Sequence, residues 1–219
     1  MPQSHKSRNF FLDGPVGRLE AILWSSRHGS VPTLAALVCH PHPLFGGTMH
    51  NKVVYQATKS LDELGLAVLR FNFRGAGSSE GKHDRGQGER DDVHAALDYL
   101  AKEFPGTPLL LAGFSFGCWV GLRAGCEDTR VTELIGIGAP VNDSDFSYLS
   151  KCEKPKLFLQ GSEDQFGSID KLEVLVASLP GTNRVRTVQG ADHFFTGKLD
   201  QLGLAIADWF AGRHPQIRK

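Results

Sequence analysis

The sequence lacks long hydrophobic runs, a net charge and any clustering of its few cysteines. No apolar run approaches the roughly 18 residues that a transmembrane helix requires, and the first nine residues are polar, without the apolar core of a signal peptide. Lysine and arginine total 24, which equals the total of aspartate and glutamate, and no local basic stripe is present. Nucleic acid and membranes are therefore not expected as partners.

The four cysteines, at positions 39, 118, 126 and 152, lie far apart and form no C-x-x-C pair. We expect structural free thiols, which suit a reducing compartment and therefore a cytoplasmic protein. Nothing in the sequence specifies an oligomeric state.

The chain contains short apolar runs that alternate with helix-length segments, after a predicted hairpin of residues 10–12 and 19–24. Continuously apolar runs are typical of parallel strands that helices cover on both faces. The predicted parallel strands are residues 34–39, 67–71, 109–112, 133–137, 156–159 and 185–188. The predicted helices are residues 53–64, 89–102, 118–124, 169–179 and 199–211. These elements predict a single α/β domain over residues 1–219, with an eight-stranded sheet and a flexible tail at residues 1–8.

One serine, Ser115, stands between two glycines in Gly113-Phe114-Ser115-Phe116-Gly117, where a predicted strand meets a helix that we expect Gly125 to end. The turn forces strained backbone angles on the serine, and side chains at either glycine would collide with the neighbouring strand or helix. This is the nucleophile-elbow pattern, which holds a hydroxyl at the carboxyl end of a sheet. It predicts Ser115 as the nucleophile of a serine hydrolase.

The same pattern occurs a second time, as Gly77-Ser78-Ser79-Glu80-Gly81. Residues 74–76 separate it from the preceding apolar strand, and the polar residues 82–85 follow it in place of an apolar helix. An elbow is identified by a strand directly before the motif and a helix directly after it, not by the pattern alone. The second copy lacks this context, and we interpret it as a loop.

A serine nucleophile needs a base, normally a histidine, which a carboxylate orients. In an elbow-type fold the acid and then the histidine follow the serine, each after a later strand. His193 follows the last predicted strand and is the expected base, and Asp164, which follows residues 156–159, is the favoured acid. The alternative acids are Glu163, Asp192, Asp143 and Asp145.

The tetrahedral intermediate needs backbone donors for its oxyanion, and the amide of Phe116 is the first expected donor. The second is expected from the loop His40-Pro41-His42-Pro43-Leu44-Phe45-Gly46-Gly47, where two prolines leave His42 or Leu44. The histidines of this region, including His50, have no carboxylate or cysteine at ligand-like spacing, so we expect no metal and no cofactor. An apolar acyl or aromatic pocket is predicted from Phe45, Phe114, Phe166 and Phe194.

With these residues placed, the chain resembles small bacterial α/β-hydrolases of the dienelactone-hydrolase-like type. The matching segments are HPHPLFGGTM (40–49), LRFNFRG (69–75), GFSFG (113–117), GSED (161–164) and ADHFF (191–195). The resemblance implies the α/β-hydrolase fold with Ser115, Asp164 and His193 as the catalytic triad. A true dienelactone hydrolase differs in its cysteine nucleophile, so the serine argues against that activity. Many relatives insert a cap domain before the acid, but here only residues 139–155 separate the sixth and seventh strands, and we expect an open site.

The predicted function is hydrolysis of small-molecule carboxylic esters through an acyl-enzyme on Ser115. A thioesterase or a peptidase acting on short peptides would use the same triad. The alternatives of other classes are a transferase or lyase on the same scaffold and a non-catalytic binding module, which would be expected to lack a triad member.

Overall fold

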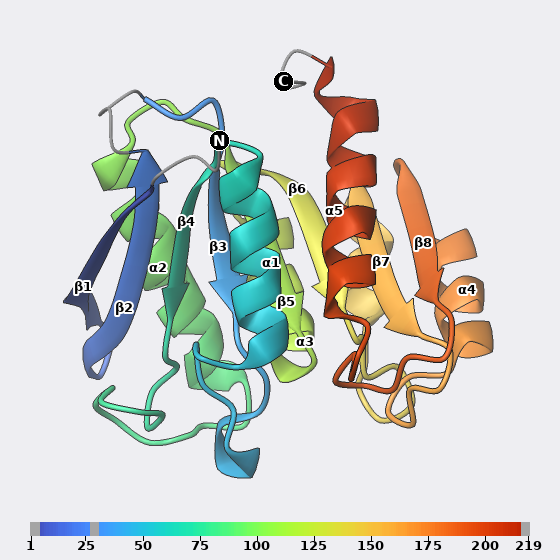
Figure 1. The fold of residues 1–219 in the computed structure, drawn as a ribbon. Helices are drawn as coiled ribbons and strands as arrows, with labels where there is room; N and C mark the ends of the chain where they lie inside the picture. The colour runs from blue at the N-terminus through green and yellow to red at the C-terminus, as the bar shows by residue number, and fades with distance from the viewer. Residues whose placement is uncertain (1–4, 27–30, 216–219) are drawn as a thin grey trace.

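Eight strands form one sheet in the order β1-β2-β4-β3-β5-β6-β7-β8 in the computed structural model, which describes residues 5–26 and 31–215 (Figure 1). The strands are β1 (His5–Gly14), β2 (Gly17–Ser26), β3 (Ala35–Cys39), β4 (Ala67–Phe71), β5 (Leu109–Phe114), β6 (Val131–Ile137), β7 (Lys156–Gly161) and β8 (Asn183–Val188). Strand β2 pairs antiparallel with β1 and with β4, and all other pairs are parallel. The predicted eight-stranded, mostly parallel sheet with an antiparallel hairpin is confirmed.

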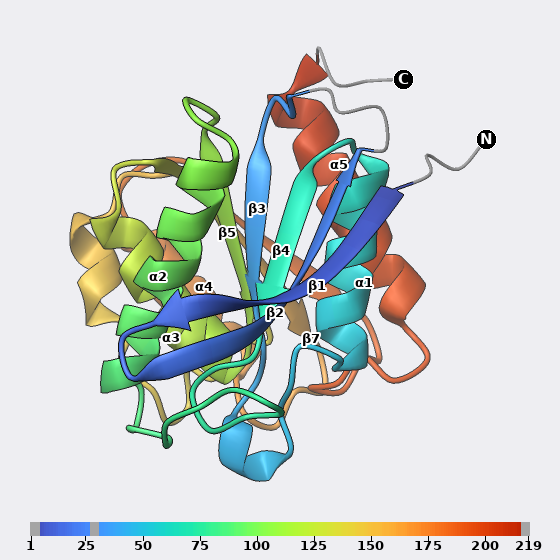
Figure 2. The same ribbon diagram turned by 90° about the vertical axis from the view of Figure 1, so that its left-hand side faces the viewer.

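Five α-helices in the described part of the chain cover the two faces of this sheet. They are α1 (Lys52–Glu63), α2 (Gln87–Glu103), α3 (Phe116–Glu127), α4 (Ile169–Ala177) and α5 (Leu199–Arg213). Figure 2 shows α1 and α5 on one side of the sheet and α2, α3 and α4 on the other. Each face of the sheet packs against its helices in a separate apolar cluster. Successive residues of a strand point to opposite faces, so Leu37 belongs to one cluster and Val38 to the other. None of the helices among these residues is both long and apolar enough to cross a bilayer.

The N-terminal hairpin is longer than the sequence predicted. Strand β1 begins at His5 and pairs with β2 along its whole length. The expectation of a flexible tail is therefore wrong for residues 5–8, and residues 1–4 lie outside the described residues. The polar side chains there stay at the surface, where Arg8 Nη2 lies 2.9 Å from Glu103 Oε1 of α2. Backbone hydrogen bonds hold an outer strand in the sheet even where its side chains are polar and exposed. The polar residues 5–8 therefore gave no hydrophobic signal of a strand.

Helix α3 continues through Gly125 to Glu127, so the prediction that Gly125 ends it is wrong. A Cβ atom at Gly125 would lie only 2.7 Å from Leu134 Cδ2 of β6. The glycine therefore serves close packing of the helix on the sheet, not helix termination.

The parallel strands direct their carboxyl ends to one edge of the sheet, at the lower end of Figure 1. The loops after β3, β5, β7 and β8 leave the sheet at this edge, and they carry the residues predicted to be functional. The connection from β6 to β7 spans residues 138–155 and contains only the short 3₁₀ helix η2 (Ser147–Lys151). The described chain therefore carries no cap domain over this edge.

Candidate active site

Ser115 lies in a strained turn between β5 and α3. Its backbone φ of 55° and ψ of −116° are held by a 2.9 Å hydrogen bond from its amide to Ile137 O. A Cβ at Gly113 would lie 2.1 Å from Gly117 O, and one at Gly117 would lie 2.5 Å from Cys39 O. The two glycines therefore permit the close backbone approaches that raise the serine above the sheet edge.

His193, in the loop after β8, places its imidazole against this serine. The distance from His193 Nε2 to Ser115 Oγ is 2.9 Å, and the residue is only 2% exposed. The ring of Phe114 lies beneath the imidazole at a centroid distance of 5.0 Å, and that of Phe166 lies at 4.6 Å. These rings fix the orientation of the imidazole and limit its contact with water.

Asp164, in the loop after β7, lies behind the histidine. Its Oδ2 is 2.8 Å from His193 Nδ1, and its Oδ1 accepts hydrogen bonds from the amides of Phe166, at 2.8 Å, and Gly167, at 3.2 Å. A carboxylate that accepts at both oxygens favours the tautomer with a proton on Nδ1, which leaves Nε2 free to accept the Ser115 proton. The structure therefore brings the three predicted residues into one hydrogen-bonded chain.

The other carboxylates considered as the acid make no contact with His193 Nδ1 in the described residues. Asp192 accepts from the amides of Thr196 and Phe194 in its own loop, and these bonds, with that of Thr196 the strongest cause, hold the pKa of Asp192 below its ordinary value. Asp145 accepts from the amide and hydroxyl of Ser147. Glu163 and Asp143 are exposed.

Gln160 is a buried positioning residue that the sequence-based prediction did not include. Its Nε2 donates to Asp164 Oδ2 at 2.8 Å and to Gly167 O at 2.9 Å, and its Oε1 accepts from the amide of Ala139 at 2.8 Å. The side chain joins the acid loop to the end of β6. A glutamine in an otherwise apolar strand end was the available signal, because a buried amide requires partners.

The backbone amides of Phe116 and His42, both near Ser115, have no acceptor among the described residues. Phe116 is the first residue of α3, whose amide has no partner within the helix. The amide of Leu44 donates to His42 Nδ1 at 3.2 Å instead, and the Leu44 side chain is exposed. Of the two alternatives left open by the sequence, His42 lines the cavity in front of Ser115, whereas Leu44 does not.

His40 ties the loop of His42 to the rest of the fold. Its ring is fully buried, lies 2.6 Å from Pro41 O through Nδ1, and accepts the amide of Phe73 at Nε2 at 2.9 Å. Burial lowers the pKa of His40 to about 4, and the bond to Pro41 O opposes this only in part. The neutral ring therefore donates to one loop and accepts from another.

His40 is expected to make the protein less stable as the pH falls. In the unfolded chain His40 takes up a proton near its ordinary pKa of 6.5, whereas in the folded chain it does so only near a pKa of about 4. The contribution of His40 to the free energy of unfolding is therefore complete above pH 6.5 and is lost as the pH falls toward 4. The loss amounts to up to about 3 kcal/mol. Urea unfolding at pH 7 and pH 5 measures it, with His40→Asn as a variant that cannot titrate and keeps a donor for Pro41 O. An equal loss of stability in both proteins would contradict this role.

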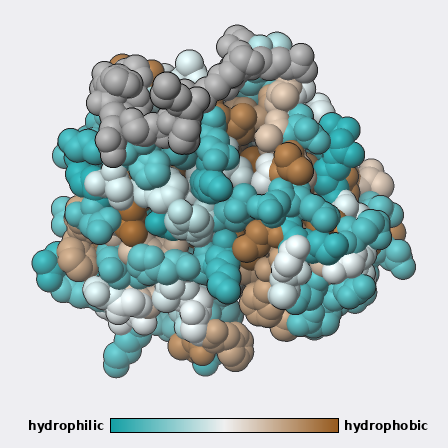
Figure 3. All heavy atoms as spheres, in the orientation of Figure 1, coloured by the Kyte–Doolittle hydropathy of each residue, from teal (hydrophilic) through white to brown (hydrophobic). Residues whose placement is uncertain are grey.

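A cavity of about 460 Å³ opens in front of Ser115. Phe45, Phe166 and Phe194, three of the residues proposed from the sequence for a substrate pocket, line this cavity and are exposed. The prediction for Phe114 is wrong, because this ring is fully buried beneath His193 and does not reach the cavity. Trp119 is a lining residue that was not predicted. Figure 3 shows apolar surface, in brown, at the lower end of the molecule, where the strands have their carboxyl ends.

The second glycine–serine motif lies in the loop between β4 and α2, as predicted. Ser79 Oγ donates to Asn72 O at 2.7 Å and accepts from the amide of Glu20 at 2.9 Å. Its hydroxyl is therefore used to hold the loop against β2.

The described residues include no group of three histidine, cysteine or carboxylate side chains arranged to hold a metal ion. Of the histidines near the site, His40 uses both ring nitrogens in hydrogen bonds. The four cysteines are free thiols, and burial raises the pKa of Cys39 and Cys118 well above the ordinary value.

Residues 37–204 match a family described as an alpha/beta hydrolase domain. An uncharacterized protein of Rickettsia prowazekii, RP471, is 40% identical over 208 residues, which cover 91% of this chain and 87% of that protein.

Several solved structures are similar over most of the chain. XC6422 from Xanthomonas campestris, described as an α/β serine hydrolase without a lid, has a TM-score of 0.86 at 36% identity, with 94% of each chain covered. A serine hydrolase homologue from Coxiella burnetii has a TM-score of 0.85 at 37% identity, covering 90% of this chain and 94% of that one. Est1E from Butyrivibrio proteoclasticus, solved with ferulic acid bound, has a TM-score of 0.82 at 18% identity, covering 93% of this chain and 98% of its own, which shows a likeness of fold alone.

Proposed function

Because the chain belongs to the alpha/beta hydrolase domain family, we propose that it is a serine hydrolase that cleaves small carboxylic esters through an acyl-enzyme on Ser115. The observation that carries the proposal is the chain of contacts from Ser115 Oγ to His193 Nε2, at 2.9 Å, and from His193 Nδ1 to Asp164 Oδ2, at 2.8 Å. This chain ends at the serine hydroxyl, at the base of an apolar, open cavity.

In the first half-reaction Ser115 Oγ attacks the ester carbonyl carbon, and its proton moves to His193 Nε2. Asp164 stabilises the imidazolium that results. The tetrahedral intermediate then collapses, the bond to the alcohol oxygen breaks, and His193 returns the proton to the departing alcohol. The acyl group is left on Ser115.

The negative charge on the carbonyl oxygen needs donors while the intermediate exists. We assign these to the amides of Phe116 and His42, because both residues line the cavity and the amide of Leu44 is already bonded to His42 Nδ1. His40, through Pro41 O, holds the His42 amide in place before substrate arrives. In the second half-reaction a water molecule attacks the acyl carbon and gives a proton to His193 Nε2. The bond between the acyl carbon and Ser115 Oγ then breaks, the carboxylic acid leaves, and His193 returns the proton to Oγ.

The shape of the cavity favours small or exposed esters with an apolar acyl group. The aromatic side chains at its mouth support this, as does the short β6–β7 connection, which leaves the edge uncovered in the described chain. The narrower, dienelactone-hydrolase-like assignment rests on the shared sequence segments, and Ser115 in place of cysteine argues against dienelactone cleavage itself. The four free thiols support the cytoplasmic location expected from the sequence.

A fluorophosphonate probe tests the proposal directly, because it forms a bond only to an activated serine. We expect the wild-type protein to be labelled and Ser115→Ala to remain unlabelled. Ser78→Ala, which removes an exposed hydroxyl from the second glycine–serine motif, is the matched control and should be labelled like the wild type. If the wild-type protein is not labelled, or if Ser115→Ala is labelled as strongly as the wild type, the serine-hydrolase assignment is contradicted.

The type of bond that is cleaved is then determined by comparing kcat/KM for p-nitrophenyl esters, acyl-thioesters and short peptides that carry the same acyl group. The proposal expects the highest kcat/KM for esters. A higher kcat/KM for thioesters or peptides would be consistent with the proposed triad but would contradict the proposed ester hydrolysis.

A further inference from the structure

The wall of the cavity in front of Ser115 carries a negatively charged side chain and no lysine or arginine among the described residues. Among the described residues that line it, Asp143 is the one carboxylate, and lysine and arginine are absent. Asp143 is one of the residues considered as the triad acid, a role that the geometry gives to Asp164. A carboxylate on the wall of an otherwise apolar cavity bears directly on which substrates enter.

The carboxylate of Asp143 has no hydrogen-bond or ion-pair partner among the described residues. Its neighbour Asp145 provides the contrast, since Asp145 accepts from both the amide and the hydroxyl of Ser147, at 2.8 Å each. Those bonds, the one from the amide first, lower the pKa of Asp145. Of the two acids on this segment, one is engaged within the fold and the other faces the cavity.

The segment that carries Asp143 is held in place by its backbone and by its neighbour. The amides of Asp143 and Ser144 both donate to Pro140 O, at 3.3 and 3.0 Å. Asn142 Nδ2 donates to Gln165 O at 3.1 Å, and Asn142 Oδ1 accepts from the amide of Ser168 at 3.4 Å. The segment is thereby tied to the acid loop, so the backbone of Asp143 is held in place relative to the triad.

Aromatic rings line the same cavity as this carboxylate. Trp119 lines the same cavity, and its indole N–H donates to Asp145 O at 2.9 Å, two residues beyond Asp143. Phe116 lies next to Trp119 at a centroid distance of 6.0 Å, and Phe166 also lines the cavity. A carboxylate together with aromatic faces is the combination that binds organic ammonium groups.

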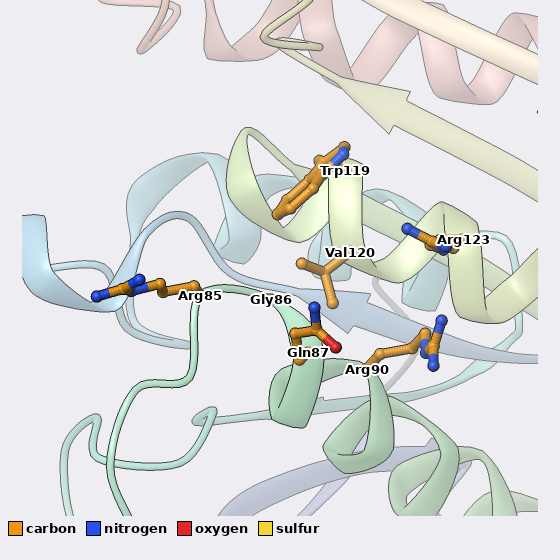
Figure 4. Close-up of a pocket in the computed structure, with 7 residues that line it drawn as sticks. All are labelled: Arg85, Gly86, Gln87, Arg90, Trp119, Val120 and Arg123. Carbon is orange, nitrogen blue, oxygen red and sulfur yellow. The ribbon is translucent and has the colours of Figure 1, made fainter. Parts of the chain in front are cut away.

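A second cavity, beyond Trp119, contains the nearby arginines. It is lined by Arg85, Arg90 and Arg123, and Trp119 borders both cavities. Figure 4 shows Arg90 and Arg123 facing each other from α2 and α3, while the side chain of Arg85 extends away from both. Arg90 and Arg123 share Glu127, at 3.7 and 4.0 Å. These arginines therefore contribute no positive side chain to the wall of the Ser115 cavity.

We propose that the Ser115 cavity prefers esters that carry an ammonium group, with Asp143 as the counter-ion, and disfavours esters that carry a carboxylate or phosphate. The inference rests on the proposed ester hydrolysis and names the substrate class of that site. Asp143 is a specificity-determining residue, outside the proton-transfer chain. Because its carboxylate is exposed, we expect a modest effect of about two- to fivefold.

The test compares two esters of the same shape, butyrylcholine and 3,3-dimethylbutyl butyrate, in which a carbon replaces the ammonium nitrogen. The ratio of their kcat/KM values cancels general changes in catalytic competence. Asp143→Asn should lower the ratio of kcat/KM for the charged ester to kcat/KM for the neutral ester by about two- to fivefold. The control Asp208→Asn removes the same charge from the exposed face of α5 and should leave the ratio within twofold. High salt should lower the ratio in the wild type and not in Asp143→Asn.

A binding measurement keeps this inference separate from the proposed function. The dissociation constant of phenyltrimethylammonium, from isothermal titration calorimetry, should rise by the same factor in Asp143→Asn and remain unchanged in Asp208→Asn. If neither ester is cleaved, ester hydrolysis fails and the binding constants alone decide the role of Asp143. An unchanged dissociation constant, or a kcat/KM ratio that Asp143→Asn alters by less than twofold, overturns the inference.

Discussion

Replacement of His193 by alanine is expected to lower kcat for ester hydrolysis by about 10⁴-fold or more. The imidazole is the only base within hydrogen-bond distance of Ser115 Oγ among the described residues, at 2.9 Å. Without it the hydroxyl keeps its proton and is a poor nucleophile. Binding should survive, because the backbone donors and the aromatic walls remain, so the loss should fall on kcat rather than on KM.

Single-turnover and steady-state assays with a p-nitrophenyl ester measure this loss. His94→Ala, which removes a histidine from the surface of α2, is the matched control and should retain wild-type kcat. A His193→Ala variant with more than a tenth of the wild-type kcat would show that another group is the base.

Gly117→Ala is expected to damage the fold itself. The added Cβ would lie 2.5 Å from both Cys39 O and His40 O, and these backbone atoms at and just after the end of β3 cannot move aside as a flexible side chain could. Overpacking of this kind costs about 1–3 kcal/mol, and α3 would have to move away from β3 to relieve it. Such a movement displaces Ser115 and the amide of Phe116, so activity should fall together with the free energy of unfolding.

Gly212→Ala is the matched control for this prediction. Gly212 lies near the end of α5, and a Cβ there meets nothing within 4 Å. Alanine favours the helix, so this variant should be more stable than the wild type by about 0.5–1 kcal/mol. Urea unfolding followed by circular dichroism measures both variants. If the two substitutions change the free energy of unfolding in the same direction, close packing at the elbow is not the reason for Gly117.

Much of the fold could be predicted because its strongest signals are local. The apolar runs of β3, β4, β5 and β7 are buried on both faces of the sheet, so their continuous hydrophobicity marked the parallel strands, and 67–71 was predicted to the residue. The hairpin was underestimated because β1 is exposed and polar, and exposed strands carry little hydrophobic signal. Gly125 was misinterpreted for a related reason, since the same residue type ends helices and permits close contacts.

The site was predictable in part. Ser115, Asp164 and His193 each follow a strand, so chain order alone could bring them to one edge of the sheet. Gln160 and Phe114 show where that reasoning stops. Both lie in strands, and whether such a side chain supports the triad or lines the cavity depends on which face of the strand meets which neighbour.

The sequence by itself therefore determined the alternation of strands and helices, the elbow at Ser115 and the order in which acid and base follow it. Only the tertiary structure decided which carboxylate meets His193, which amides are left without an acceptor, and that the unpartnered carboxylate of Asp143 faces the cavity. The physical reason is that spacing along the chain sets local conformation, whereas hydrogen bonds and charge pairs depend on distances between segments that are far apart in sequence.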